Sequence, residues 1–187
     1  MKVAITDQMK TRAAEEARRR DPHITHHFNV GHMTGEQRDV VGFVGEFACC
    51  EFLGINWESN IRANYLTIDT GDIQTNGLIS DVKTETLPFD ALQKVYNKTI
   101  NDDEPWGRRL INENQVHLLH RYDIVIFGGV VREENYQEWY PFGYLETDYI
   151  LNNYVVTNQR PYGGQYPYAA LPIKTSELKD LNELLKK

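Results

Sequence analysis

The segment GDIQTNGLISDVKTET, residues 71–86, holds two aspartates on either side of an Asn76-Gly77 pair. An Asn-Gly pair between two β-like runs is the strongest short-range indication of a hairpin with a two-residue turn. A turn at this position predicts that Asp72 and Asp81 lie directly opposite each other on neighbouring strands. Like charges placed in this way repel, so the pair needs a proton, a cationic side chain or a bound cation.

Lys83 shares the predicted face of Asp81, because side chains alternate along a strand. Ile73, Leu78 and Val82 would then face the core. Two carboxylates supply the oxygen ligands that a hard ion such as Mg²⁺ or Mn²⁺ prefers. A lysine beside such an ion can orient a water molecule or stabilise charge that develops on a phosphate.

Glu46 is a third candidate carboxylate, in the middle of an expected helix over residues 35–53. Its helical neighbours Gly42, Cys49 and Cys50 form a small, largely uncharged face. A carboxylate on such a face is unfavourable without a partner, which a metal ion or a lysine would supply.

Three short motifs resemble the PD-(D/E)XK nuclease superfamily. They are Gly45-Glu46 on the helix, Gly71-Asp72 on a strand, and Asp81-Val82-Lys83, followed by Thr84, on the next strand. The resemblance covers roughly residues 35–131 and implies a restriction-endonuclease-like fold, a central mixed sheet flanked by helices. Gly71 stands where the family usually has a proline.

The resemblance also implies roles for these residues. Asp72 and Asp81 would bind the metal, with the Val82 carbonyl as a further ligand, and Glu46 would bind it directly or through water. Lys83 would position the attacking water. The implied activity is Mg²⁺- or Mn²⁺-dependent hydrolysis of phosphodiester bonds, with a DNA endonuclease as the leading expectation. Many members act as dimers, so a homodimer is compatible with the resemblance, and a phage or prokaryotic role in genome processing, repair or restriction would suit the chain.

Three alternatives stay open. The chain could be an RNA-directed endonuclease, or it could keep the nuclease fold as a binding or assembly module without catalysis. The third alternative is a hydrolase with a histidine-bound metal in segment 21–32, which contains Pro22 and Gly31 and is expected to be a loop. The histidines of that segment are His23, His26, His27 and His32, and solvated or packing roles are favoured for them.

Arg108 and Arg109, next to Trp106, are candidates for contacting a phosphate and stacking on a base. A solvated turn with a packed tryptophan would explain the same residues. Gln115, His117 and His120 are expected on a helix surface, with one facing the site as the alternative, and Asp123 is expected to be structural. Tyr162, Tyr166 and Tyr168 are expected in a packed loop, with the lining of a substrate groove as the alternative.

The elements that position these residues follow from periodicity and capping signals. Thr34 and Gln37 have capping-box spacing before the central helix, and Gly54 is a natural stop after it. Other expected elements are a helix over 3–20, a strand at 65–68, an irregular or helical excursion over 88–120, a buried strand over 122–131, a strand over 139–146 with a short helix near 148, a loop from 160 leading into a short strand, and a terminal helix over 177–187. This order predicts a mixed α/β fold.

The composition fits one domain over residues 1–187, with 41% hydrophobic and 25% charged residues. The net charge of −7 argues against a protein that coats nucleic acid without specificity. No apolar run is long enough to span a membrane, and the N-terminus lacks the apolar core of a signal peptide, so an intracellular, cytoplasmic protein is expected. Cys49 and Cys50 are adjacent and are expected to be packed thiols rather than a disulfide.

Overall fold

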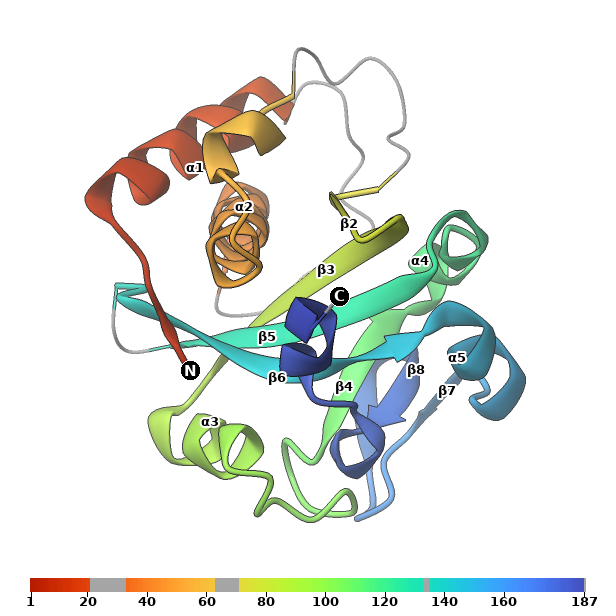
Figure 1. The fold of residues 1–187 in the computed structure, drawn as a ribbon. Helices are drawn as coiled ribbons and strands as arrows, with labels where there is room; N and C mark the ends of the chain where they lie inside the picture. Colours follow the sequence, from red (N-terminus) through yellow and green to blue (C-terminus); the bar gives the residue numbers. More distant parts are fainter. Residues whose placement is uncertain (21–32, 63–70, 133–134, 187) are drawn as a thin grey trace.

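A five-stranded mixed sheet forms the centre of the computed structural model, which describes residues 1–20, 33–62, 71–132 and 135–186 (Figure 1). The strand order is β1-β6-β5-β3-β2, and only β3 and β5 run parallel. The strands are β1 Val3–Ala4, β2 Ile73–Thr75, β3 Leu78–Leu87, β5 Ile124–Val131 and β6 Glu138–Glu146. The expected mixed α/β class is confirmed.

A second, antiparallel sheet has the order β4-β8-β7. Its strands are β4 Arg108–Asn112, β7 Thr157–Gln159 and β8 Gln165–Lys174. The helices are α1 Asp7–Arg20, α2 Gly35–Phe52, α3 Phe89–Tyr96, α4 Glu113–Val116 and α5 Thr147–Asn153. Short 3₁₀ turns cover Trp57–Asn60, Leu119–Arg121, Thr175–Glu177 and Leu181–Lys186.

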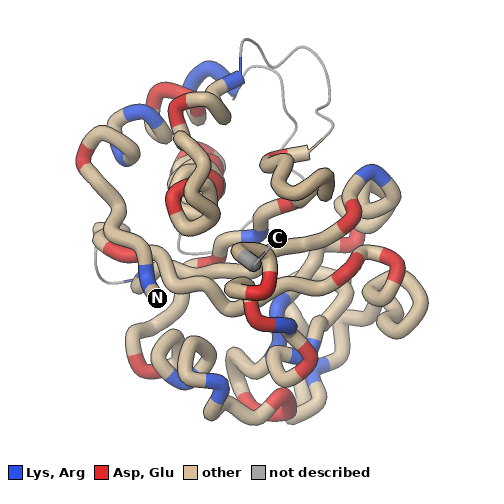
Figure 2. Tube along the Cα trace, viewed as in Figure 1, with Lys and Arg blue, Asp and Glu red and all other residues tan. Residues whose placement is uncertain are grey.

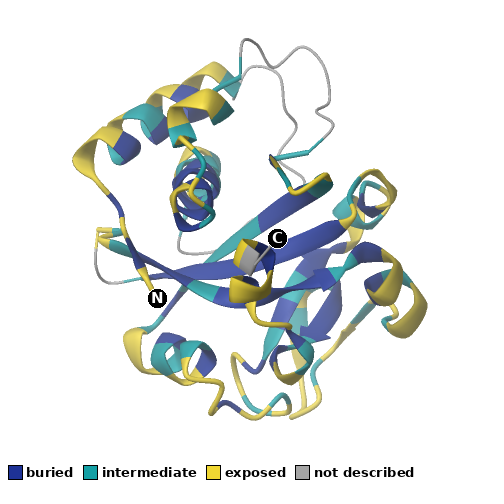
Figure 3. Ribbon diagram, viewed as in Figure 1, coloured by how far each residue is buried: buried dark blue, intermediate teal, exposed yellow. Residues whose placement is uncertain are grey.

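Each face of the central sheet is covered by its own layer (Figures 1 and 3). Helices α1 and α2 cover one face, where Phe47 and Val82 belong to the first hydrophobic cluster. Helix α3, the second sheet and α5 contribute to a second cluster, with Leu92 and Ile173, on the other face. Strand β5 is buried along its whole length, and its side chains alternate between the two clusters. The predicted buried central strand is therefore confirmed.

The capping signals of α2 act as predicted. Thr34 accepts a hydrogen bond from the Gln37 amide, and the Gln37 side chain accepts one from the Thr34 amide, at 3.2 and 2.8 Å. After the helix, Gly54 has a φ of +72°, a conformation that favours glycine. At the N-terminus, the expected helix over 3–20 begins only at Asp7, because residues 3 and 4 pair with β6 instead.

The Asn76-Gly77 turn also forms as predicted. Both residues have positive φ, +50° and +78°, as a two-residue hairpin turn with matching twist requires. The Asn76 side chain donates a hydrogen bond of 2.6 Å to the Leu184 carbonyl, which ties the turn to the C-terminal segment. Parallel pairing of β3 with β5 then spans residues 80–87 and 124–131.

Three expectations about elements were wrong. The excursion over 88–120 contains a strand, β4, and the expected loop and short strand after residue 160 include the ten-residue strand β8. These strands pair with each other, which the sequence patterns of each alone do not reveal. The terminal segment forms 3₁₀ turns rather than an α-helix.

The strand expected at 65–68 lies outside the described residues. None of the described helices is long and apolar enough to cross a membrane.

Candidate functional site

Asp72 lies just beyond the paired part of the β2–β3 hairpin. Paired residues end at Ile73 and Ser80, and the Asp72 amide donates to the Ser80 carbonyl at 2.9 Å. The predicted ladder position directly opposite Asp81 is therefore not occupied by Asp72. Instead, the Asp72 carboxylate accepts a hydrogen bond of 2.8 Å from the Val82 amide. This contact still holds Asp72 against the strand that carries Asp81.

Gly71 has a backbone conformation that excludes proline at this position. Its φ is +151°, which proline cannot adopt because its ring holds φ near −65°. A Cβ at Gly71 would also lie 2.3 Å from Cγ2 of Ile79. The chain approaches β3 closely at this point, and glycine permits the approach that brings Asp72 to Val82.

Asp81 and Lys83 form an ion pair on the face of β3 that carries the second cluster. The Lys83 ammonium lies 3.0 Å from Oδ1 of Asp81, to which it donates, and 2.8 Å from Oδ2. Oδ2 is buried and accepts no hydrogen bond from the described residues. The Lys83 side chain is 24% exposed and that of Asp81 6%, so the pair is accessible through its lysine end.

Glu46 lies on the other face of the sheet. Helix α2 packs on that face, where a Cβ at Gly45 would be 1.8 Å from Oγ1 of Thr84. Thr84 and Val82 point toward α2, so Asp81 points away from it. Glu46 nevertheless stays within reach of both aspartates, because the charges of Asp72 and Asp81 contribute to raising its pKa.

Arg62 links the carboxylates of Asp72 and Glu46. Its guanidinium is 3.0 Å from Oδ1 of Asp72 and 3.9 Å from Oε2 of Glu46. Arg62 follows the 3₁₀ turn over Trp57–Asn60, and no sequence motif singled it out. The four predicted residues and Arg62 thus form a row of charges that crosses the edge of the sheet.

Burial and mutual repulsion shift the pKa values of this row. Burial first, and then the charge of Asp81, raises the pKa of Asp72 to about 7. Burial and the charge of Asp72 raise the pKa of Glu46 well above its ordinary value. Burial alone would lower the pKa of Lys83, but Asp81 and Asp72 outweigh it, and the net shift is upward. The site therefore favours an ammonium at Lys83 and disfavours ionisation of Asp72 and Glu46.

The oxygen donors around Asp72 and Asp81 are few. In the described parts of the chain, no three side chains of His, Cys, Asp or Glu are grouped so that they could hold an ion. Asp72 and Asp81 remain as two carboxylates that repel each other, and the Val82 carbonyl is a third oxygen. Because the amide and carbonyl of one strand residue point to the same side, that carbonyl faces Asp72, beyond the end of the ladder. This set fits a hard cation that completes its shell with water.

Arg109, predicted to contact phosphate, is only 1% exposed. It forms a short ion pair with Glu85 of β3, donates to the Trp106 carbonyl, and lies 5.3 Å from the centre of the Phe142 ring. The structure therefore gives Arg109 a structural role. Glu85 compensates the buried charge of Arg109. The two residues are 24 positions apart in the sequence, so no local pattern indicates the contact.

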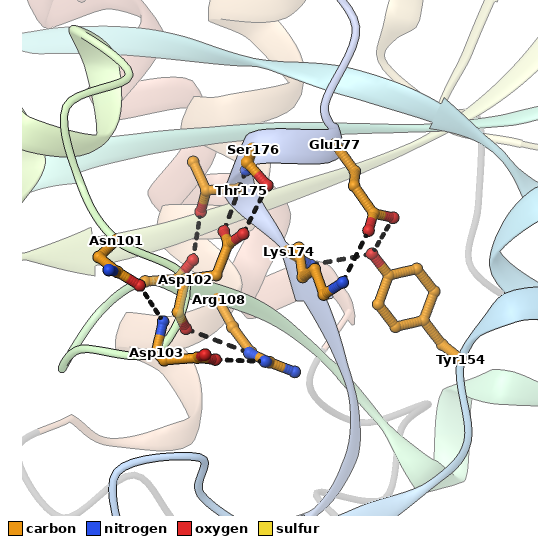
Figure 4. A network of polar contacts seen from close by, with 10 residues as sticks. Asn101, Asp102, Asp103, Arg108, Tyr154, Lys174, Thr175, Ser176 and Glu177 are labelled. Carbon is orange, nitrogen blue, oxygen red and sulfur yellow. Dashed lines mark hydrogen bonds and ion pairs between the residues drawn. The ribbon is translucent and has the colours of Figure 1, made fainter.

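Arg108 is also engaged within the protein. It donates to the Asp102 carbonyl at 3.1 Å and pairs with Asp103 at 2.6 Å (Figure 4). Trp106, in contrast, is 40% exposed, so of the three predicted nucleic-acid contacts only the indole is open to a ligand.

The remaining candidates differ in their surroundings. Asp123 accepts a hydrogen bond of 2.7 Å from the Ile79 amide, a structural role, and Cys49 and Cys50 are buried free thiols. His117 and His120 are exposed. Tyr162 is exposed, whereas Gln115, Tyr166 and Tyr168 are half-buried. The segment with His23, His26, His27 and His32 lies outside the described residues.

Comparisons with known proteins add no relative: no family model, no curated protein and no solved structure matches the chain. The site is thus interpreted from its own geometry. Figure 2 shows acidic and basic residues interspersed along the chain, so local groups rather than one charged face would recognise a ligand.

Proposed function

We propose that the chain is a metal-dependent phosphodiesterase that cleaves nucleic acid, with DNA as the leading substrate. One observation carries this proposal. A buried aspartate, Asp81, is paired with a partly exposed lysine, and a second aspartate, Asp72, is held against the same strand by the Val82 amide. The raised pKa of Asp72 supports the proposal, because a bound cation would stabilise the ionised pair.

Asp72, Asp81 and the Val82 carbonyl would hold a Mg²⁺ or Mn²⁺ ion. Such an ion, when bound, supplies a Lewis acid for the phosphate and lowers the pKa of water. Glu46 would bind this ion directly or through water, and Arg62 links it to Asp72.

The chain's own residues would contribute orientation and charge. Lys83 is the partly exposed member of the pair, and its ammonium can hold a water molecule or a phosphate oxygen. Its raised pKa keeps it charged at neutral pH. Arg62 fixes one oxygen of Asp72, while the Val82 amide fixes the other, so this carboxylate has a defined orientation before any ligand arrives.

A second candidate function is a binding or assembly module without catalysis. The observation that favours it is the ion pair between Lys83 and Asp81, which already neutralises this aspartate without a metal ion. The described residues also lack a group of three metal-binding side chains. Activity therefore has to be measured directly.

The test is cleavage of supercoiled plasmid and of single-stranded DNA and RNA oligonucleotides with Mg²⁺ or Mn²⁺. Wild type is compared with Asp81→Asn and Lys83→Ala. Lys94→Ala is the matched control, because Lys94 forms an exposed ion pair with Glu104 on another part of the surface. We expect the site variants to lose about 100-fold or more in rate, as is typical for a group that stabilises the transition state.

The products distinguish the remaining possibilities. Metal-dependent cleavage that Lys94→Ala retains and the site variants lose would support the proposal. Nicked circles would indicate single-strand cutting, whereas linear products that depend on protein concentration would support a dimer. Mn²⁺ binding by calorimetry with no cleavage of any substrate, or equal activity of all variants, would reject catalysis at this site.

A further inference from the structure

Trp106 presents an exposed indole from an unusually constrained turn. Its φ is +68°, a left-handed conformation that is rare for a bulky residue and that persists only where the surroundings impose it. Nevertheless its side chain is not packed into the core, since the residue is 40% exposed. A strained, exposed aromatic residue suggests a contact with a ligand.

The turn over residues 101–108 is fixed from two sides. Thr175 donates a hydrogen bond of 2.7 Å to the Gly107 carbonyl, and the Ser176 amide donates one of 3.1 Å to Asp102 (Figure 4). A Cβ at Gly107 would lie 2.1 Å from the Asn101 carbonyl oxygen, so the turn is closed tightly on itself. From the sheet side, buried Arg109 joins the Trp106 carbonyl to Glu85 of β3. The indole is therefore held at a fixed position relative to β3.

Arg132 completes the arrangement. Its guanidinium carbon lies 5.1 Å from the centre of the Trp106 ring. In the described part of the chain it has no carboxylate partner, and its Nε is buried without a hydrogen-bond partner. Its only side-chain hydrogen bond there is a long one, 3.4 Å, to the Thr86 carbonyl. A positive charge thus stands over one face of a partly exposed indole.

The Trp106–Arg132 pair lies beside the end of β3, the strand that carries the candidate catalytic pair. Arg132 contacts Thr86 and Leu87 at the end of β3, and Lys83 is three residues before Thr86. At a rise of about 3.3 Å per residue, the separation along the strand is about 10 Å, which a few nucleotides can span. Lys83 and Glu85, the residue to which the turn is anchored, share one face of β3.

We infer that Trp106 and Arg132 form a subsite for an unpaired nucleobase and its phosphate, beside the cleavage site. An indole provides a stacking surface that accepts any base, and a guanidinium binds phosphate oxygens. A base within a duplex cannot stack on a side chain, so the ligand is a single strand of DNA or RNA. This inference rests on the proposed function only in taking nucleic acid as the partner.

The test measures binding without cleavage. Fluorescein-labelled single-stranded DNA and RNA oligonucleotides are titrated with protein in EDTA, and fluorescence anisotropy gives the Kd. Trp106→Leu and Arg132→Gln should each weaken binding about 10-fold or more, whereas Trp106→Phe should retain most of it. Arg160→Gln is the matched control, because Arg160 also lies over aromatic rings, 5.7 Å from those of Tyr162 and Tyr166, but at the β7–β8 hairpin.

Tryptophan emission provides a second readout. Stacking on Trp106 should quench the emission of wild type but not of Trp106→Phe, since Trp139 is buried and Trp57 packs against Phe47. Unchanged Kd values, an equal loss in Arg160→Gln, or binding of duplex only would overturn the inference. The cleavage assays with metal are independent of this binding test. An active enzyme without the subsite would cleave normally as Trp106→Leu, whereas a binding protein without activity would lose affinity in Trp106→Leu and cleave nothing.

Discussion

Asp72 links the electrostatics of the candidate site to stability. In an unfolded chain an aspartate ionises near pH 4, whereas in the folded protein burial and the charge of Asp81 raise the pKa of Asp72 to about 7. Between these values the unfolded state releases its proton first. The contribution of Asp72 to the free energy of unfolding therefore falls as pH rises from about 4 to about 7, and stays constant above that range.

Asp72→Asn should remove this dependence. The amide still accepts a hydrogen bond from Val82 but cannot ionise, so the variant should gain stability relative to wild type between pH 4 and pH 7, by as much as about 4 kcal/mol. Urea unfolding of both proteins at several pH values would measure the difference. A difference that does not change with pH would show that Arg62 and Val82 keep the Asp72 carboxylate ionised in the folded state.

Arg109 provides the second prediction at this scale. Removing its partner by Glu85→Ala leaves a charge with 1% exposure unpaired, which should lower the free energy of unfolding by about 3 kcal/mol or more. Glu104→Ala breaks the exposed pair with Lys94, at 3.6 Å, and should change stability by less than about 1 kcal/mol. Denaturation curves would compare the two, and equal losses would contradict a structural role for the Glu85–Arg109 pair.

Helix α2 and strand β3 touch at Gly45, which makes their contact testable at the level of elements. Gly45→Ala would place a Cβ 1.8 Å from Oγ1 of Thr84, so the helix must move away from the strand. We expect a loss of about 1–3 kcal/mol in the free energy of unfolding. Gly42→Ala is the control on the same helix, since a Cβ there meets nothing within 4 Å, and it should stabilise the protein by up to about 1 kcal/mol. Similar effects of the two substitutions on thermal unfolding would argue against the close contact.

Elements with local signals could be predicted, and those that depend on distant partners could not. The capping box at Thr34 and the Asn76-Gly77 turn act through neighbouring backbone, so α2 and the β2–β3 hairpin follow from the sequence. Strands β4 and β8 stabilise each other across a long sequence separation, and β8 contains prolines that disfavour a strand assignment.

The same distinction applies to the candidate site. Asp81 and Lys83 are two residues apart on one strand, so their pairing could be predicted from alternation alone. The position of Glu46 depends on which face of the sheet α2 covers, and periodicity within the helix does not determine that face. Arg62 and Arg132 could not be identified, because each acts through a residue far from it in sequence or in another element.

The charge of the whole molecule sets an expectation for how it binds a polyanion. The net charge is −7, and residues 21–32, 63–70 and 133–134 contain no lysine or arginine. With this net charge, affinity for a polyanion would depend on local cations, and the proposed site supplies Lys83 and Arg132. Each phosphate neutralised on a single strand contributes about −0.7 to the slope of log K against log salt concentration.

If Lys83 and Arg132 are the principal phosphate contacts, the slope for a short single-stranded oligonucleotide should be no steeper than about −2. Anisotropy titrations in EDTA between about 50 and 200 mM NaCl would measure it, and Arg132→Gln should make the slope shallower by about 0.7. A slope of about −5 would require many more cations than β3 and its neighbours offer. Binding would then involve a different surface, and both the path along β3 and the subsite at Trp106 would have to be abandoned.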